Sequence, residues 1–202
     1  MSGEKTVPAE PWGDRIRQAY EDEDARLRRE HDRSLPFQDA MFDRWDRARK
    51  LGFGEKASIY NSAVIFGSVT VGEESWIGPY VVLDGAGGSI RIGSTVSISC
   101  GVHVYTHDTI AWALTGGAID PRRGSVSIGD RCYIGSQCVI TAGVAIGNGC
   151  VVAADSVVNK DVPDGVVVGG SPARRLGQVE MRDGQPVLVY DDGSETFVAE
   201  GF

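Results

Sequence analysis

The sequence predicts a mainly β fold, a parallel β-helix, and three observations carry the prediction. An apolar residue recurs every six positions between Phe53 and Val158. A small residue stands four places after most of them. Glycine contributes 27 of the 202 residues, almost twice its usual share of about 7%, which is typical of a chain with many tight turns. A period of six is neither helical nor a simple strand alternation, so it predicts short straight segments joined by sharp corners.

The repeat keeps one register over two blocks. In the first block the count slips by three residues at Gly85-Ala86-Gly87-Gly88, and the second block follows a non-repeating stretch that runs to Val126. Three segments close one coil, whose strands pair in parallel with the neighbouring coils at about 4.8 Å. The apolar positions are Phe53, Ile59, Ile65, Val71, Ile77, Leu83, Ile92, Ile98, Val104, Ile128, Ile134, Ile140, Ile146, Val152 and Val158.

The small residues of the repeat account for three of the four cysteines. We expect Cys132 and Cys150 to stack one coil apart as reduced thiols, because in-register parallel strands do not offer disulfide geometry. Cys100 lies outside the pattern and near His103, so a Cys/His nucleophile pair remains an alternative. The small positions are Ser75, Val81, Val96, Val102, Cys132, Cys138, Val144, Cys150, Ser156 and Val162.

Segments without the repeat flank it on both sides. Residues 1–50 are predicted to be helical, over Trp12 to Arg29 and again after Pro36, where one apolar face would carry Phe37, Met41, Trp45 and Ala48. Residues 178–202 alternate apolar and polar side chains around Asp183-Gly184 and Asp192-Gly193, which favours a small β-meander. The expected organisation is a helical segment over 1–50, a β-helix over 51–177 and a β extension over 178–202.

Composition excludes several classes of partner. With 20 basic and 28 acidic residues, a net charge of −8 leaves no basic face for a nucleic acid. No stretch approaches the roughly 20 apolar residues that a membrane span needs, and the polar N-terminus has no leader-like core. Four cysteines without close CxxC pairs fit neither a disulfide scaffold nor a zinc ribbon. We expect a cytoplasmic protein without a membrane span.

The one long interruption of the repeat is where chemistry is expected. Residues 106–125 should form an arm that leaves the coils, and insertions on a regular scaffold often carry function. His103 and His107, two of only three histidines, stand at its entrance. His103 falls on a regular corner, whereas His107 lies at the base of the arm beside Asp108, a carboxylate able to orient an imidazole. We therefore interpret His107 as the general base.

With these residues in place, the chain resembles the hexapeptide-repeat acyltransferases, which fold as a left-handed parallel β-helix, and within them the sugar and xenobiotic O-acetyltransferase branch. The resemblance covers about residues 51–177. Its most specific motifs are Ile128-Gly-Asp-Arg-Cys-Tyr-Ile-Gly135, Ile140-Thr-Ala-Gly-Val-Ala-Ile-Gly147, Ala154-Asp-Ser-Val-Val-Asn-Lys-Asp-Val-Pro163 and Gly170-Ser-Pro-Ala-Arg-Arg-Leu-Gly177.

The resemblance implies a site. Thr106-His107-Asp108 matches the position of the family's catalytic histidine, and Asp84 matches a residue that contacts the acceptor. His103, Asp108 and Trp112 are expected beside the acceptor. Many relatives have Trp where this chain has Tyr133, and Thr where it has Asn159. Residues implied to bind coenzyme A are Tyr133, Ser136, Ala142, Gly143 and Ala154 along the pantetheine arm, and Lys160, Arg174 and Arg175 near the phosphates.

The resemblance also implies an activity and an assembly. We expect an acetyltransferase that uses acetyl-CoA without a metal to acetylate a sugar-like hydroxyl, working as a homotrimer with sites between subunits. N-acetylation or antibiotic acetylation on the same fold is an alternative. A zinc hydratase like the γ-class carbonic anhydrases is another, although His103 and His107 have no third histidine in the repeat. An inert scaffold is the third, and serine acetyltransferases share the arrangement of helices and prism.

Overall fold

The protein is described here by a computed structural model that covers residues 11–198. Within them the chain forms two compact units, which meet in sequence at Asp43 and Arg44. The first unit is helical and the second contains the repeat.

The helical unit contains α1 (Pro11–His31) and α2 (Phe37–Met41). α1 confirms the helix expected around Trp12 to Arg29. The Tyr20 hydroxyl donates to the Leu35 carbonyl over 2.8 Å, and its ring lies 5.6 Å from that of Phe37. These contacts hold the chain after α1 against the middle of that helix.

The prediction of one helix through Phe37 and Ala48 is wrong. α2 ends at Met41, Phe42 has an extended backbone with φ −123° and ψ 129°, and a new helix, α3 (Arg44–Lys50), begins in the second unit. Ala48 of α3 is buried at 1% exposure in the core of the repeat. α3 therefore closes the first end of the β-helix, and the helical unit ends at residue 43 rather than 50.

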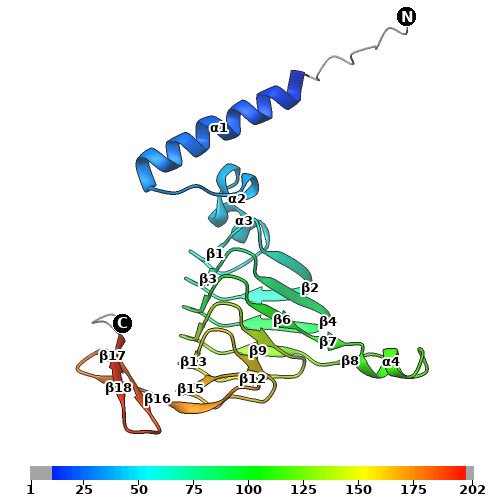
Figure 1. The fold of residues 1–202 in the computed structure, drawn as a ribbon, viewed down its shortest axis with the longest axis vertical. Coiled ribbons are helices and arrows are strands. Elements are labelled where there is room, and N and C mark those ends of the chain that lie inside the picture. Colours follow the sequence, from blue (N-terminus) through cyan, green and yellow to red (C-terminus); the bar gives the residue numbers. More distant parts are fainter. Residues whose placement is uncertain (1–10, 199–202) are drawn as a thin grey trace, which may run out of the picture. The chain divides into compact units, whose positions relative to one another are not determined.

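The second unit is a parallel β-solenoid of stacked coils with three faces (Figure 1). One face stacks one short strand from each coil, and the long strands β2 and β4 bend around an edge to serve both other faces. The first face contains β1 (Ser58–Ile59), β3 (Trp76–Ile77), β5 (Ser97–Ile98), β10 (Tyr133–Ile134), β13 (Val151–Val152) and β15 (Val166–Gly169). The other faces contain β2 (Val64–Val71), β4 (Val82–Ile92), β6 (His103–Tyr105), β9 (Val126–Ile128), β11 (Val139–Ile140), β12 (Ala145–Ile146) and β14 (Val157–Val158).

The core consists of the residues that the register predicted. Thirteen of the fifteen apolar positions are buried, and only Phe53 and Ile65 are partly so. All ten small positions are at most 5% exposed. Cys132, Cys138 and Cys150 are buried free thiols, as expected, and Cys100 is half-buried. Contact with the Cys150 thiol, together with burial, raises the pKa of Cys132, which removes it as a nucleophile.

One edge of the prism carries a continuous series of side chain to backbone hydrogen bonds, which we call the polar ladder (Ser94, Asp130, Asn148 and Asp164). The backbone N–H of Ser94 donates to an Asp130 carboxylate oxygen over 2.8 Å. In the same way the Asp130 N–H donates to the Asn148 amide oxygen over 2.9 Å, and the Asn148 N–H donates to an Asp164 carboxylate oxygen over 2.8 Å. A Cβ added to Gly147 would lie 2.1 Å from the Asp164 carboxylate. Glycine at this place in the repeat therefore makes room for the ladder.

The slip in the register and the arm are neighbours in space. β2 and β4 pair Gly67 with Gly85 and Ser68 with Ser89, so Ala86, Gly87 and Gly88 form a three-residue bulge, called the glycine bulge below. In the next coil the arm leaves the prism (Figure 1). It contains β7 (His107–Asp108), α4 (Ile110–Leu114) and β8 (Arg122–Arg123), and β7 and β8 pair antiparallel at its base.

The last strands confirm the expected β-meander. β16 (Arg174–Arg182) pairs antiparallel with β15, and β17 (Gln185–Tyr190) and β18 (Glu195–Phe197) follow around the two predicted Asp-Gly turns. The end of the predicted extension, residues 199–202, lies outside the described residues. No helix in the described part of the chain is long and apolar enough to cross a membrane.

Candidate functional site

The base of the arm brings His107 next to a carboxylate. His107 Nδ1 lies 3.9 Å from Asp84 Oδ2, and the two side chains are 33% and 15% exposed. Nδ1 itself is buried, and within the described residues it has no hydrogen-bond partner. The accessible part of the ring therefore lies on its other atoms. A partly exposed imidazole with one nitrogen toward a carboxylate suits proton transfer.

Strand pairing and Thr106 fix this geometry. Thr106 is fully buried, and its hydroxyl donates to the Asp84 carbonyl over 2.7 Å and accepts the Gly87 N–H over 3.0 Å. The Ala86 N–H donates to Asp84 Oδ1 over 3.1 Å, which leaves Oδ2 as the oxygen toward His107. The side chains of His107 and Asp84 are thus held from two neighbouring coils.

The other residues predicted near the acceptor are dispersed. His103 Nδ1 lies 3.1 Å from the Tyr105 hydroxyl, so its partner is Tyr105 rather than the thiol of Cys100. Asp108 Oδ1 accepts the Ile110 N–H over 3.2 Å and starts α4. Trp112 stands on α4 with half of its side chain exposed. Of the predicted acceptor residues, the structure brings only Asp84 against His107.

The residues expected to bind coenzyme A fall on two edges of the prism. Ser136 and Ala154 lie in the turns between β10 and β11 and between β13 and β14, with Tyr133 on the adjoining face. Ala142 and Gly143 lie in the turn between β11 and β12, and Lys160 follows β14 on that same edge one coil further on. A single subunit therefore does not bring all of them together.

The arm covers part of the second edge. Arg122 of β8 donates to the Ala142 carbonyl over 3.1 Å, and the Gly143 N–H donates to the Gly124 carbonyl over 3.3 Å. Ala142 is consequently only 4% exposed. The sequence did not single out Arg122 or Thr106, because their roles depend on the path of the arm.

The three predicted phosphate-binding side chains do meet. Lys160, Arg174 and Arg175 line a cavity of about 240 Å³ at the last coil, with Val158, Val166 and Val168 among its apolar residues. Arg175 also pairs with Asp191 over 3.2 Å. Cationic side chains around an apolar floor suit a ligand with phosphates and an apolar portion.

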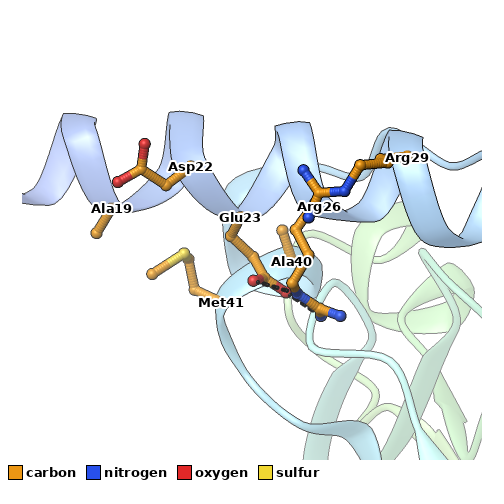
Figure 2. A pocket seen from close by; sticks show the side chains of 7 residues that line it. All are labelled: Ala19, Asp22, Glu23, Arg26, Arg29, Ala40 and Met41. Atoms are coloured by element: carbon orange, nitrogen blue, oxygen red, sulfur yellow. Dashed lines mark hydrogen bonds and ion pairs between the residues drawn. The ribbon is translucent and has the colours of Figure 1, made fainter.

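A second hollow lies in the helical unit, between α1 and α2 (Figure 2). Asp22, Glu23, Arg26 and Arg29 line it, and Figure 2 shows Glu23 and Arg26 turned toward each other. Their ion pair is 2.6 Å long. Glu23, Arg26 and Arg29 thus form ion pairs within α1. Across residues 11–198, no three side chains of His, Cys, Asp or Glu gather as a metal site would require.

Comparisons with known proteins agree with this architecture. Residues 125–160 match the family described as the hexapeptide repeat of succinyl-transferase. Galactoside O-acetyltransferase of Escherichia coli is 31% identical over 134 residues, which cover 56% of this chain and 66% of that protein. 2,3,4,5-Tetrahydropyridine-2,6-dicarboxylate N-acetyltransferase of Clostridium perfringens is 42% identical over 83 residues, which cover 41% and 35%. The chain thus matches less than two thirds of the length of these two relatives.

A solved structure extends the likeness to almost the whole chain. The hexapeptide-repeat acetyltransferase VCA0836 of Vibrio cholerae, complexed with acetyl coenzyme A, is 31% identical with a TM-score of 0.58, and the match covers 87% of this chain and 93% of that one. The coils, the matched repeat and this similarity agree with one another. The chain belongs to the hexapeptide-repeat acyltransferase family.

Proposed function

We propose that the protein transfers the acetyl group of acetyl-CoA to a hydroxyl of a sugar-like acceptor, with His107 as general base. The observation that carries the proposal is the imidazole, one third exposed, whose buried Nδ1 faces Asp84 at 3.9 Å. Acetyl-CoA binds the Vibrio relative, and the Escherichia coli relative acts on galactosides. These properties of two similar proteins support the proposal for this chain.

His107 would act through Nε2. It accepts the proton of the acceptor hydroxyl while that oxygen attacks the thioester carbonyl, and it returns the proton to the departing thiolate as the carbon–sulfur bond breaks. Asp84 holds the Nδ1–H tautomer and stabilises the imidazolium that forms between these steps. The gap of 3.9 Å is wider than a hydrogen bond, and such contacts often tighten only when substrate is bound.

The cationic cavity supports the assignment of the coenzyme. Lys160, Arg174 and Arg175 are suited to the phosphates. The strands β6, β11 and β14 are successive neighbours on one face of the prism. At the usual strand spacing, β14 therefore lies about 10 Å from β6, the strand that leads to His107. The pantetheine arm would follow that face toward the base. The Gly143 N–H, bonded to Gly124, would have to be shared to stabilise an oxyanion.

We further propose a homotrimer with the sites between subunits. Tyr133, Ser136 and Ala154 occupy a different edge from His107 and Lys160, so a neighbouring copy is needed to complete a groove that both sets line. Large apolar side chains remain exposed on the coils, including Val64, Phe66 and Tyr133 at 41%, 51% and 47%. Exposed apolar area of this kind favours an interface between copies.

Release of free thiol from acetyl-CoA, measured against a panel of sugars, nucleotide sugars and antibiotics, tests the activity. His107→Ala should lower kcat by about 10²- to 10⁴-fold while KM for acetyl-CoA stays close to wild type. His31→Ala, in the helical unit, is the matched control and should retain full activity. Transfer by His107→Ala at the wild-type rate would refute the assignment.

Mixing two inactive variants tests the assembly. His107→Ala and Ser136→Trp remove the base and block the opposite wall, so random exchange of subunits should restore about a quarter of the wild-type activity if each site takes one part from each neighbour. Sedimentation of the wild-type protein as a monomer at assay concentrations, or no recovery on mixing, would contradict the trimer.

The second candidate is transfer to an amine. The Clostridium perfringens relative is an N-acetyltransferase and matches the coils over 83 residues at 42% identity. An amine is nucleophilic once deprotonated, so it relies less on His107 when it binds neutral. Amino sugars in the same panel decide between the two: turnover with amines alone would replace the hydroxyl acceptor by an amine.

A further inference from the structure

One of the three residues that break the repeat lies directly against the proposed base. Gly87 is the middle residue of the glycine bulge, and a Cβ added to it would lie 2.5 Å from His107 Cβ and 2.7 Å from the Thr106 carbonyl oxygen. Carbon atoms in ordinary contact are about 3.5–4.0 Å apart. Any side chain at position 87 would therefore push His107 outward by about 1 Å.

Gly87 is needed for space and not for its backbone conformation. It is absent from the residues with a left-handed φ, a group that contains eleven other glycines of the described chain. An alanine could adopt the backbone of Gly87 without strain, and only the neighbours of its Cβ forbid it. The nearest neighbours of a side chain at this position would thus be His107 and Thr106.

The bulge also touches the partner of the base and the other end of the arm. Its Ala86 N–H holds Asp84 Oδ1, and its Gly87 N–H holds the Thr106 hydroxyl. Gly88 approaches Ser125, where the chain returns from the arm. Three extra residues in one coil therefore contact both ends of the arm that the next coil inserts.

From these contacts we infer that the glycine bulge positions His107, and that Gly87 is the residue against which His107 packs. This inference rests on the proposed role of His107 as base. Gly87 lets the His107 strand approach β4 closely enough for Nδ1 to face Asp84, and the Ala86 N–H turns the acid toward it. Gly87 touches no reacting atom and acts only through His107.

Nuclear magnetic resonance of the imidazole nitrogens tests this placement without an acceptor. The chain has three histidines, so ¹⁵N signals can be assigned with single His→Gln variants. In the wild-type protein His107 should carry its proton on Nδ1. Gly87→Ala should shift the His107 signals and mix the two tautomers, while His31 stays unchanged as an internal reference. Gly88→Ala, the same change one residue on, meets Ser125 no closer than 3.0 Å and should shift the His107 signals less than Gly87→Ala does.

A second pair of variants covers the case in which Gly87→Ala does not fold. Thr106→Val keeps the shape but loses both hydrogen bonds that tie Thr106 to Asp84 and Gly87 of β4, and it should shift the His107 signals as Gly87→Ala does. Thr106→Ser keeps the hydroxyl and should restore the wild-type signals. Unchanged His107 signals in a folded Gly87→Ala or in Thr106→Val would overturn the inference.

The values of kcat and KM distinguish a positioning role of Gly87 from a purely structural one. A displacement of about 1 Å can cost on the order of 10²-fold in rate, so Gly87→Ala should lose kcat to that extent with KM for acetyl-CoA little changed. In a His107→Ala background the further change Gly87→Ala should have no effect on residual transfer. If His107 is not the base, transfer by His107→Ala stays high while the nitrogen signals still report its packing against Gly87, so the two failures are distinguishable.

Discussion

The regular coils differ from the arm junction, the place where Thr106 and His107 meet β4. The difference is whether their polar atoms have hydrogen-bond partners. Along the polar ladder each oxygen meets a backbone N–H of the preceding coil at 2.8 or 2.9 Å. At the junction the hydroxyl of Thr106 is used in the same way, but Nδ1 of His107 is buried without a hydrogen-bond partner in the described structure. The polar ladder thus pairs its side-chain oxygens with backbone N–H groups, whereas the place where the repeat is broken leaves one buried nitrogen without a partner among the described residues.

That difference has an energetic meaning. A buried polar atom without a partner costs about 1–3 kcal/mol, so the surrounding fold must stabilise it. The stacked coils supply this stability, and at the junction it holds an imidazole near a carboxylate. If this is correct, changes in the coils should affect stability and changes at the junction should affect turnover.

The largest expected effect is in the core of the coils. Ile134 is fully buried, so Ile134→Ala should lower the free energy of unfolding by about 2–5 kcal/mol because it leaves a cavity. Turnover per folded molecule should not change. Thr70→Ala, at an exposed position of β2, is the control and should stay within about 0.5 kcal/mol. Urea unfolding measures both, and equal midpoints would contradict the division between coils and junction.

A smaller loss is expected at the polar ladder. In Gly147→Ala the new Cβ would meet the backbone nitrogen of Asp164 at 2.6 Å, so the next coil must shift and unfolding should become easier by about 1–3 kcal/mol. Gly13→Ala, in α1 with no atom near its added Cβ, should be neutral or slightly stabilising. A Gly147→Ala protein as stable as wild type would show that the ladder tolerates expansion.

A substitution at the junction should lower the rate and leave the stability unchanged. Asp84→Asn removes the charge that faces His107, so kcat should fall about tenfold or more while the unfolding midpoint stays near wild type. Asp130→Asn makes the same change in the polar ladder, where an amide oxygen can still accept the Ser94 N–H, and its kcat should not change. Equal kcat values for the two variants would remove Asp84 from the mechanism.

The smallest expected effect is a pH dependence of the ladder. Donation by the Asn148 N–H lowers the pKa of Asp164 in the folded protein. The resulting stabilisation is fully present above the unfolded pKa of about 3.9 and is lost as the pH falls through the lower folded value. The difference in Tm between wild type and Asp164→Asn should therefore shrink between pH 5 and pH 3. A difference in Tm that stays constant with pH would show that the charge of Asp164 does not contribute to stability.

The sequence predicted the coils well because a six-residue period reports on the backbone itself, and a narrow interior admits only small residues such as Cys132 or Ser156 at its corners. The break between α2 and α3 was missed because neither Phe42 nor Asp43 is a helix breaker. The partner of His107 was also misplaced. Asp108 is adjacent in sequence, but consecutive strand residues point to opposite faces, so the acid that faces His107 comes from the neighbouring coil.

The way the arm begins and ends has a consequence for its length. Thr106 at its start and Gly124 near its end are joined by a hydrogen bond of 2.9 Å, so the excursion returns to the place where it left. Doubling a flexible loop closed in this way costs only about 0.6 kcal/mol. Residues added between α4 and β8 should therefore cost the coils little stability and leave His107 and Asp84 in place.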